Sequence, residues 1–419
     1  EDGWAKRSRQ MTSLLTIRSV SEMHILLIAS WYSTPANPLR GSFFREQALA
    51  LQAAGHQVGI LVVPGRVRTW SGLAEIRAHW RQSPIDFTRE DDSGIPTYRM
   101  PWWGWKAILS LRYRGNLALR GYDRYCADHG EPDVLHSYSA LYAGFAAAWI
   151  GRHRHRPAVM SEYATWILQG PVLPGQHRFI RYAVENSQRC LTIGASLVIA
   201  LQRYVPGKPV EPIGTSINVD FFAPSSDVLP AAPFVFSVIA HLMRKKRIDL
   251  LLEAFASAFR GQDVRLYVGG DGAERQKLEQ LAGRLGIQPQ VIFTGRLFRK
   301  AVRDLIWQSH AVVSSSHVET FGITLAEAHA CGKPVVATRS GGPEFFVDDS
   351  NGILVERDNP AALAAAMRQL RDNYAQYDPV AIRAKCVARF SEDAIVRRLE
   401  TIYRDVVSEN AASGNEKRG

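Results

Sequence analysis

Short apolar runs alternate with stretches of helical periodicity along most of this chain, and this alternation limits the fold more than any other feature of the sequence. Residues 23–30 (MHILLIAS) form an apolar run typical of a buried parallel strand. Residues 43–58 then predict a helix, a glycine stop and the start of a second strand. The same order continues through strand-like runs at 133–138, 158–163 and 190–196. Repeated β-α-β order of this kind predicts a doubly wound parallel sheet.

A second series of the same kind begins near residue 234, with FVFSVIA. Residues 247–259 follow with apolar side chains at helical spacing, which indicates a helix lying on a sheet. Those side chains are Ile248, Leu251, Leu252, Phe255 and Phe259. Further strand-like runs follow at 264–272, 290–295, 310–316, 333–342 and 352–356. We therefore expect an α/β protein with two Rossmann-like, doubly wound domains.

The proline-rich stretch 204–214 (YVPGKPVEPIG) is the natural linker between the two series. We expect an N-terminal domain over 23–203 and a C-terminal domain over 215–388. An amphipathic helix over 391–407 is expected to pack back on the N-terminal domain. Two such domains in tandem would place the carboxyl ends of both sheets around one cleft, where open α/β sheets bind ligands.

The chain is basic, with a formal net charge of +11, and most of the excess lies in the N-terminal half. A basic surface attracts phosphates, nucleic acids or an anionic membrane, and the charge does not choose among them. The four cysteines form no C-x-x-C pair, as expected of reduced thiols. No apolar run reaches the roughly 18 residues that span a bilayer, and residues 1–22 lack the features of a signal peptide. We therefore expect a cytoplasmic protein.

The stretch ETFGITLAE carries two carboxylates, Glu319 and Glu327, around a glycine. Glu319 is expected just past a strand, and a helix is expected to begin near Gly322 and to include Glu327. The amides of Gly322, Ile323 and Thr324 would then be free at a helix N-terminus, which attracts negative groups. Carboxylates accept hydrogen bonds from paired hydroxyls, so this loop suits a polyol. Alternatively, Glu319 only caps the helix and Glu327 lies on the surface.

Three more loops follow predicted strands in the C-terminal half. The glycine loops at 269–272 (GGDG, with Gly270) and 341–344 (GGPE) are typical of amide nests for anions. The stretch 240–247 (AHLMRKKR) places His241 and a run of basic side chains at another strand end, where they would meet a phosphate. Together these loops favour a phosphorylated, hydroxyl-rich ligand, which is the description of a nucleotide sugar.

These stretches resemble the donor domain of glycosyltransferase family 4, the retaining group 1 enzymes with the GT-B fold. The similarity covers 234–370 and includes HLMRKKRIDLLLEAF, LYVGGDGAER, VIFTGRL, HVETFGITLAEAHACGKPVVATRSGGPEFFV and NGILV. At the front end, PLRGSFFREQALALQAAGHQV is similar to the first loop and helix of polysaccharide-forming members. The resemblance implies two domains facing a central cleft and transfer of a hexose-type sugar from a nucleotide sugar, with UDP expected ahead of GDP.

The resemblance also implies roles for the two glutamates and the loop between them. Glu319 matches the first glutamate of the family, which implies contact with the hydroxyls of the donor sugar. Glu327 matches the second, which implies contact with the ribose. The amides of Phe321, Gly322 and Ile323 would hold the sugar and the phosphate.

The phosphate-binding pair of the family is only partly present. Lys246 matches its lysine, whereas His241 stands where the family has an arginine. A histidine is only partly charged near neutral pH, so Arg244 or Arg247 would compensate.

Three more donor contacts are implied by position. Gly295, Arg296 and Leu297 lie where the family holds the base. Gly41 lies where the N-terminal glycine loop approaches the diphosphate. Gly270 is expected to let the donor approach the backbone of the glycine loop at 269–272 closely.

The N-terminal domain departs more from the family pattern. Many members carry a second histidine after the strand that here reads DVLH, and that histidine lies near the sugar. Here His136 is followed by Tyr138, and Glu162 is followed by Tyr163 where a histidine is common. These four residues are assigned to the acceptor side, with Tyr138 bonding the sugar in place of the histidine. Alternatively, both tyrosines are core packing.

Family members transfer the sugar with retention, and the leaving phosphate helps to deprotonate the acceptor on the same face. Glu319, Lys246, His241 and Tyr138 are expected to carry this step. No metal or other cofactor is expected, because Lys246 and the amide nests would neutralise the diphosphate and no D-x-D pair occurs. Two alternatives stay open: another GT-B enzyme, such as a nucleotide-sugar 2-epimerase, and a catalytically silent nucleotide-sugar-binding protein.

The segment 99–125 joins three tryptophans to basic side chains, namely Lys106, Arg112, Arg114 and Arg120. Tryptophan with Lys and Arg on an amphipathic segment is typical of a membrane interface. We expect peripheral contact with the anionic inner face of the plasma membrane and a glycan or lipid-linked saccharide acceptor, as in surface polysaccharide synthesis. Alternatively, the tryptophans belong to the core. Nucleic acid is not expected as a partner, because no recognised binding module occurs.

Overall fold

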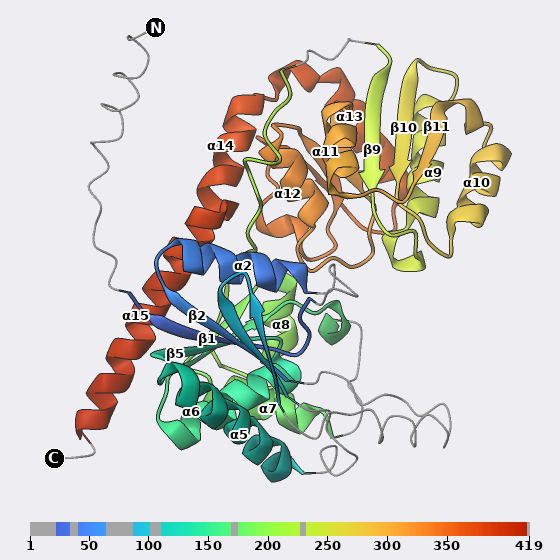
Figure 1. Cartoon of the computed structure of the whole chain (residues 1–419). Coiled ribbons are helices and arrows are strands. Elements are labelled where there is room, and N and C mark those ends of the chain that lie inside the picture. The colour runs from blue at the N-terminus through green and yellow to red at the C-terminus, as the bar shows by residue number, and fades with distance from the viewer. Residues whose placement is uncertain are drawn as a thin grey trace, which may run out of the picture.

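Two sheets, each flanked by helices, form the two halves of the molecule, and a long C-terminal helix connects them (Figure 1). The computed structural model describes residues 22–33, 41–63, 87–100, 110–168, 175–226 and 232–416. Nearly all strand pairs within each half are parallel. The prediction of two Rossmann-like domains is therefore confirmed.

The N-terminal sheet is built around the first apolar run. Its central strand β1 (His24–Ala29) is buried along its whole length, between β2 (Gln57–Val62) and β5 (Val134–Tyr138). A strand buried on both faces shows no polar alternation, which explains the run HILLIA. The other strands are β3 (Thr88–Asp92), β4 (Ile95–Arg99), β6 (Ala158–Glu162), β7 (Arg189–Thr192) and β8 (Val210–Pro212), in the order β3-β4-β2-β1-β5-β6-β7-β8. The helices are α2 (Ser42–Ala53), α5 (Leu111–His129), α6 (Phe145–Arg154), α7 (His177–Asn186) and α8 (Ala195–Gln202).

The C-terminal sheet is wholly parallel within the described residues. Its strands are β9 (Phe234–Ile239), β10 (Val264–Gly269), β11 (Val291–Gly295), β12 (Ala311–Ser314), β13 (Val335–Thr338) and β14 (Gly352–Val355), in the order β11-β10-β9-β12-β13-β14. Its helices are α9 (Ile248–Phe259), α10 (Arg275–Arg284), α11 (Arg299–Trp307), α12 (Ile323–Ala330), α13 (Pro360–Asp372) and α14 (Pro379–Phe390). The apolar face predicted for α9 is buried, from Ile248 to Phe259.

The proline-rich stretch predicted as a linker contributes a strand instead of connecting the domains freely. Residues 210–212 form β8 and pair in parallel with β7, with Val210 opposite Cys190. Proline suits such an edge position, because the outer side of an edge strand needs no amide donor. The sheet of the N-terminal half therefore extends beyond residue 203.

Helix α6, which follows β5, begins only at Phe145, after a turn over 140–144. Leu141 and Tyr142 have non-helical backbone angles, and Tyr142 has φ of +61°. The hydroxyl of Ser30 donates to the Leu141 carbonyl and accepts from the Ala143 amide, both at 3.0 Å. These bonds tie the turn to the end of β1 and use backbone groups that a helix would need.

The last helix, α15 (Glu392–Glu416), runs from the C-terminal half onto the N-terminal half (Figure 1). Two buried contacts fasten it there. The hydroxyl of Tyr403 lies 2.5 Å from Nδ1 of His136, and Oε1 of Glu400 lies 3.0 Å from Nε2 of His56. Polar groups buried in this way need their partners, so these contacts fix how α15 sits on the sheet.

Acid should weaken the folded state through His136. Burial lowers the pKa of His136 to about 3, from an ordinary value of 6.5. Between these values the unfolded chain binds a proton that the folded chain does not. The free energy of unfolding therefore falls with falling pH, by up to about 1.4 kcal/mol per pH unit for this one group. Urea titrations from about pH 6 to pH 4 should show a shallower pH dependence for His136→Gln, and an unaltered one for the exposed His177→Gln. Equal slopes for His136→Gln and the unmodified chain would contradict this account.

Candidate active site

A cavity of about 810 Å³ lies at the carboxyl edge of the C-terminal sheet. Its walls come from residues at and after the ends of β9, β10 and β11, together with Thr324 of α12. In the sheet, β9 lies between β10 and β12, although it precedes both in the chain. The chain order therefore reverses at this point, and open α/β sheets bind their ligands at such a switch point.

This cavity brings together four residues predicted for the donor site: His241, Gly270, Arg296 and Leu297. His241 is exposed, and its Nδ1 lies 2.5 Å from the carbonyl oxygen of Asp271. Gly270 has φ of +130°, and a β-carbon there would lie 1.9 Å from the carbonyl oxygen of Ala240. Only glycine allows two backbone segments to approach so closely, so the shape of the cavity depends on it.

Lys246 and Glu319 form an ion pair on the loops that follow β9 and β12. The hydroxyl of Ser316 donates to the same carboxylate oxygen of Glu319 at 2.9 Å. The two charged side chains are 18% and 17% exposed, so solvent and a ligand can reach them. A cation, a carboxylate and a hydroxyl thus meet at one place. Sequence reasoning missed Ser316, although its position directly after a strand (HAVVSSS) is a usable signal.

The loop between the two glutamates ends in an open helix N-terminus. Gly322 precedes α12 with φ of +98°, which favours glycine. No described residue accepts a hydrogen bond from the amides of Phe321, Gly322, Ile323 or Thr324. The ring of Phe321 is buried and lies 5.2 Å from that of Phe390, which anchors the loop. Such unpaired amides form a ready site for an anion.

Glu327 lies further along α12 and close to the boundary between the two halves. Burial raises its pKa to about 8, the charge of Glu46 adds to this effect and the charge of Arg299 opposes it. Glu46 of α2 and Arg299 of α11 form an ion pair between the halves, at 2.7 Å. The carboxyl group of Glu327 is therefore mostly protonated at neutral pH.

A second contact between the halves involves the Glu319 loop directly. A β-carbon on Gly194, at the start of α8, would lie 2.1 Å from the carbonyl oxygen of Thr320. A β-carbon on Gly341 would lie 2.6 Å from that of Ser196, also in α8. Sequence reasoning did not single out Gly194, although it is one more glycine that follows a strand (CLTIGAS). These glycines let α8 touch the loop that carries Glu319.

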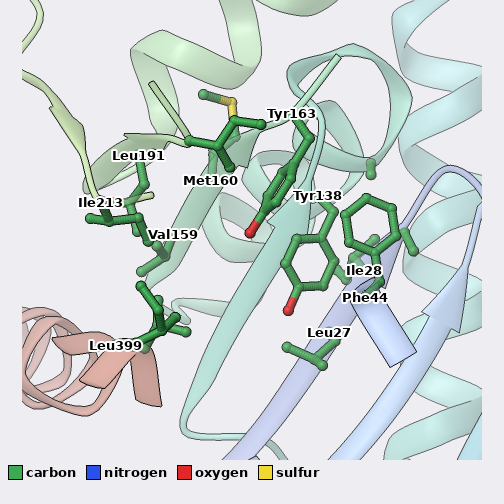
Figure 2. Close-up of a cluster of buried hydrophobic side chains, with 14 of the residues drawn as sticks. Leu27, Ile28, Phe44, Tyr138, Val159, Met160, Tyr163, Leu191, Ile213 and Leu399 are labelled. Carbon is green, nitrogen blue, oxygen red and sulfur yellow. The ribbon is translucent and has the colours of Figure 1, made fainter. Parts of the chain in front are cut away.

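The tyrosines assigned to the acceptor side are packed in the core of the N-terminal half. Figure 2 shows Tyr138 and Tyr163 beside Phe44 in a cluster of apolar side chains. The rings of Tyr138 and Phe44 are stacked with centroids 4.3 Å apart, and Tyr163 stacks on Phe43 at 5.2 Å. Tyr138 is only 1% exposed, and its hydroxyl has no hydrogen-bond partner among the described residues. This geometry favours the packing alternative for both tyrosines.

The other two acceptor-side assignments, His136 and Glu162, need correction. Both side chains are fully buried. Both ring nitrogens of His136 are engaged, one by Tyr403 and the other by the Ser161 hydroxyl at 2.7 Å. Glu162 accepts from three backbone amides, those of Ala140, Tyr163 and Ala164, at 2.7 to 2.9 Å. Burial raises the pKa of Glu162, and these amides counteract the effect. Because all of these polar atoms are used internally, the residues hold the sheet and its loops rather than an acceptor.

The structure does not bring the arginines expected to compensate for His241 into its cavity. Arg244 and Arg247 line a different hollow. Arg247 is also engaged by Asp249 at 3.2 Å and by Asp358. His241 therefore has no arginine from this turn beside it.

Gly41 stands at the start of α2, as predicted for the N-terminal glycine loop. Its φ is +76°, and a β-carbon there would lie 3.0 Å from the carbonyl oxygen of Trp31. The close approach to Trp31 requires glycine in this conformation. Residues 34–40, which lead to Gly41, lie outside the described residues.

Metal ligands are not gathered anywhere in the part of the chain that the structure describes. No group of three or more His, Cys, Asp or Glu side chains is placed there to hold an ion. A metal carried by a substrate would need fewer protein ligands. Transfer without a metal therefore stays a prediction.

Two family models match this chain, and between them they cover both halves. The model described as "Glycosyl transferases group 1" matches residues 223–386, and "Glycosyl transferase 4-like domain" matches residues 41–214. The D-inositol 3-phosphate glycosyltransferase 1 of Catenulispora acidiphila is 29% identical over 310 residues, or 66% of this chain and 73% of that protein. The lipopolysaccharide core biosynthesis glycosyltransferase LpsD of Rhizobium meliloti is 33% identical over 185 residues, or 40% and 48% of the two chains.

Solved structures agree in fold at lower sequence identity. Alr3699/HepE of Anabaena, in complex with UDP, superposes with a TM-score of 0.68 at 17% identity, covering 91% of this chain and 100% of that one. A glycosyltransferase of Rickettsia africae gives a TM-score of 0.69 at 16% identity, with coverage of 92% and 99%. At such identities the similarity shows the shared arrangement of two domains, which is the GT-B fold.

Proposed function

Since this chain belongs to the group 1 glycosyltransferases of family 4, we propose that it moves a hexose-type sugar from a UDP-sugar to a glycan or lipid-linked saccharide in surface polysaccharide synthesis. One observation carries the proposal: Lys246, Glu319 and the open amides before α12 occur at the carboxyl edge of one sheet. A cation and free amides suit a diphosphate, and a carboxylate suits sugar hydroxyls. The choice of UDP draws on HepE, whose structures contain UDP and UDP-glucose.

The proposed reaction proceeds with retention at the sugar carbon. Lys246 and the amides of Gly322 and Ile323 would stabilise the charge that develops on the leaving diphosphate. Glu319 would hold the sugar hydroxyls, so that the acceptor approaches from the same face as the leaving group. The acceptor proton would pass to the departing phosphate oxygen, and the protein would supply neither a metal nor a covalent nucleophile. His241 would contact the phosphate in the place where relatives use arginine.

The proposal also includes peripheral contact between the N-terminal half and an anionic membrane. Arg112 and Arg120 are exposed on α5, in keeping with such a face. The prediction for Arg114 was wrong, because this side chain is buried with its guanidinium 3.9 Å from the ring centre of Tyr142. Lys106 and the three tryptophans lie outside the described residues. No helix in the described ranges has the length and apolar character needed to cross a bilayer.

Sedimentation with anionic vesicles at low salt tests the membrane contact. Protein should pellet with the vesicles and be released as salt rises, because the attraction between charged surfaces is screened. Protein that stays in the supernatant at low salt would rule the contact out.

A thermal-shift screen against UDP-, GDP- and ADP-sugars tests the donor. A ligand at about 100 times its Kd stabilises the folded chain by about 2.7 kcal/mol, and this corresponds to several degrees. A shift with UDP-sugars alone would support the proposal, and a shift with another nucleotide class would replace UDP. A shift without any sugar transfer to saccharide acceptors would favour the silent binding protein.

Glu327→Gln and Glu327→Ala both introduce an uncharged side chain, but the two variants should differ in their affinity for UDP. A protonated carboxyl and an amide are both uncharged and similar in shape, so Glu327→Gln should bind UDP within about threefold of the unmodified chain at pH 7. Glu327→Ala leaves ribose hydroxyls unpaired and should weaken binding by about 5- to 150-fold, the equivalent of about 1–3 kcal/mol. Calorimetric titration with UDP measures both, with Glu279→Ala on α10 as the control. Equal losses in the two variants would show that the ionised carboxylate is required.

A further inference from the structure

A second cavity, of about 790 Å³, lies at the opposite edge of the C-terminal sheet. It is bordered by Phe234 at the start of β9, His310 just before β12 and Lys333 just before β13. These are the amino ends of parallel strands, whereas the candidate active site lies at the carboxyl ends. Figure 1 shows the amino ends of β9 and β10 on the side of the C-terminal half that faces away from the N-terminal half. The two cavities are therefore separate sites.

Two positive side chains of this second cavity, Lys333 and Arg383, have no negative partner among the described residues. The Lys333 ammonium donates to the carbonyl oxygen of Trp307 at 3.3 Å. The Arg383 guanidinium donates to the carbonyl oxygen of Ala330 at 2.5 Å. It also donates to those of Val219 and Phe222, at 3.1 and 3.3 Å, in the segment that enters the C-terminal half. No carboxylate of the described residues lies within ion-pair distance of either group. These bonds use one of the three N–H groups of Lys333 and three of the five of Arg383, so donors remain for a ligand. Carbonyl groups also leave the two charges uncompensated.

The surroundings make these two charges costly. Lys333 and Arg383 are both half-buried, and burial lowers the pKa of Lys333. The third cation on the wall, Arg371, already has a partner in Asp372 at 2.8 Å. A bound anion would compensate the two remaining charges, and Lys and Arg bind phosphate through charge-assisted hydrogen bonds.

Another part of the wall is aromatic. The rings of Phe234 and Tyr374 meet edge to face, with centroids 5.4 Å apart, and both residues line the cavity. Aromatic rings offer flat apolar contact to a ring or hydrocarbon portion of a ligand. We propose that this second cavity binds a small phosphate-bearing molecule, with the phosphate at Lys333 and Arg383 and an apolar portion against Phe234 and Tyr374. The occupant would touch Arg383, the side chain that holds the segment joining the two halves.

Calorimetric titration of the full chain with phenyl phosphate and with inorganic phosphate tests this site. Phenyl phosphate should bind more tightly than inorganic phosphate, because only the former reaches the aromatic wall. Lys333→Gln should weaken phenyl phosphate binding at least about tenfold, and Lys333→Arg should retain it. Lys300→Gln, a change at an exposed lysine on α11 of the same half, should leave it unaltered. Lys246→Ala, which removes the cation of the candidate active site, should also leave it unaltered.

Three results would overturn the proposal. The first is the absence of saturable binding at millimolar phenyl phosphate. The second is equal binding by Lys333→Gln and Lys300→Gln. The third is loss of binding in Lys246→Ala, which would place the ligand in the candidate active site. An unchanged thermal midpoint of Lys333→Gln confirms that the variant is folded, and Lys333→Arg separates loss of charge from loss of packing.

Discussion

Glu319→Ala should lower kcat/KM for sugar transfer by about 100- to 1,000-fold, the range seen when one preorganised polar group is removed from a transition-state site. Glu319 holds both Lys246 and the Ser316 hydroxyl, so its loss removes the group that bonds the sugar and releases the two groups beside it. Lys246 would then be unpaired and free to meet the diphosphate. We therefore expect kcat to fall far more than donor affinity.

Lys246→Ala should lower kcat/KM by a similar factor, and it should also weaken donor binding clearly. In the double variant, the decrease in kcat/KM should be smaller than the product of the two single decreases, because paired residues act as one unit. Lys300→Ala is a suitable control, since its ion pair with Asp304 lies on the exposed face of α11. Steady-state kinetics with the donor found in the thermal-shift screen compares the four variants with the unmodified chain. Near-normal kcat/KM in folded Glu319→Ala would remove this carboxylate from the proposed chemistry.

Among the variants proposed for the candidate active site, Gly270→Ala should cause the largest loss of stability in the C-terminal half. A β-carbon at this position would lie 1.9 Å from the carbonyl oxygen of Ala240, and φ is +130°. The obstacle is backbone, so no side-chain rotation relieves it. Backbone strain of about 1–3 kcal/mol and overpacking of about 1–3 kcal/mol together give a loss of roughly 2–6 kcal/mol in the free energy of unfolding. Nucleotide binding should be lost with it, since Gly270 lines the cavity.

Gly283→Ala is the matched control for this change. Gly283 lies inside α10 of the same half, and a β-carbon there meets nothing within 4 Å. Alanine favours a helix interior over glycine by about 0.5–1 kcal/mol, so this variant should be slightly more stable than the unmodified chain. Urea unfolding compares the two. Equal midpoints would show that the backbone near Ala240 moves aside, and the steric argument would then be wrong.

The order of strands and helices could be predicted because it follows from the local pattern of apolar and polar residues. An apolar run such as 24–29 can only be a buried strand or a short core helix, and its length and flanking loops decide. The apolar face of α9 follows in the same way from helical spacing. The edge strand β8 and the hairpin of β3 and β4 could not be predicted. Short edge strands are stabilised by the strand beside them rather than by their own residues.

The donor cavity was partly predictable for a topological reason. The carboxyl ends of parallel strands share one edge of a sheet, so the loops with His241, Gly270 and Arg296 had to be neighbours. The acceptor side was not predictable in this way. A polar residue near a strand end can face the cleft or the core, and the partners already present decide which. For His136, the decisive partner is Tyr403, which lies 267 residues later in the chain.

Local order therefore came from the residues themselves: the core strands, the glycine turns at strand ends and the helix that begins after Gly322. Their spacing follows from backbone geometry, and backbone geometry is a property of short segments. Pairing and burial came only from the tertiary structure. It joined Lys246 to Glu319 across 73 residues and Arg299 to Glu46 across 253, and it enclosed Glu327 enough to raise the pKa to about 8. Charge, proton affinity and access depend on what surrounds a side chain, and distant parts of this chain supply those surroundings.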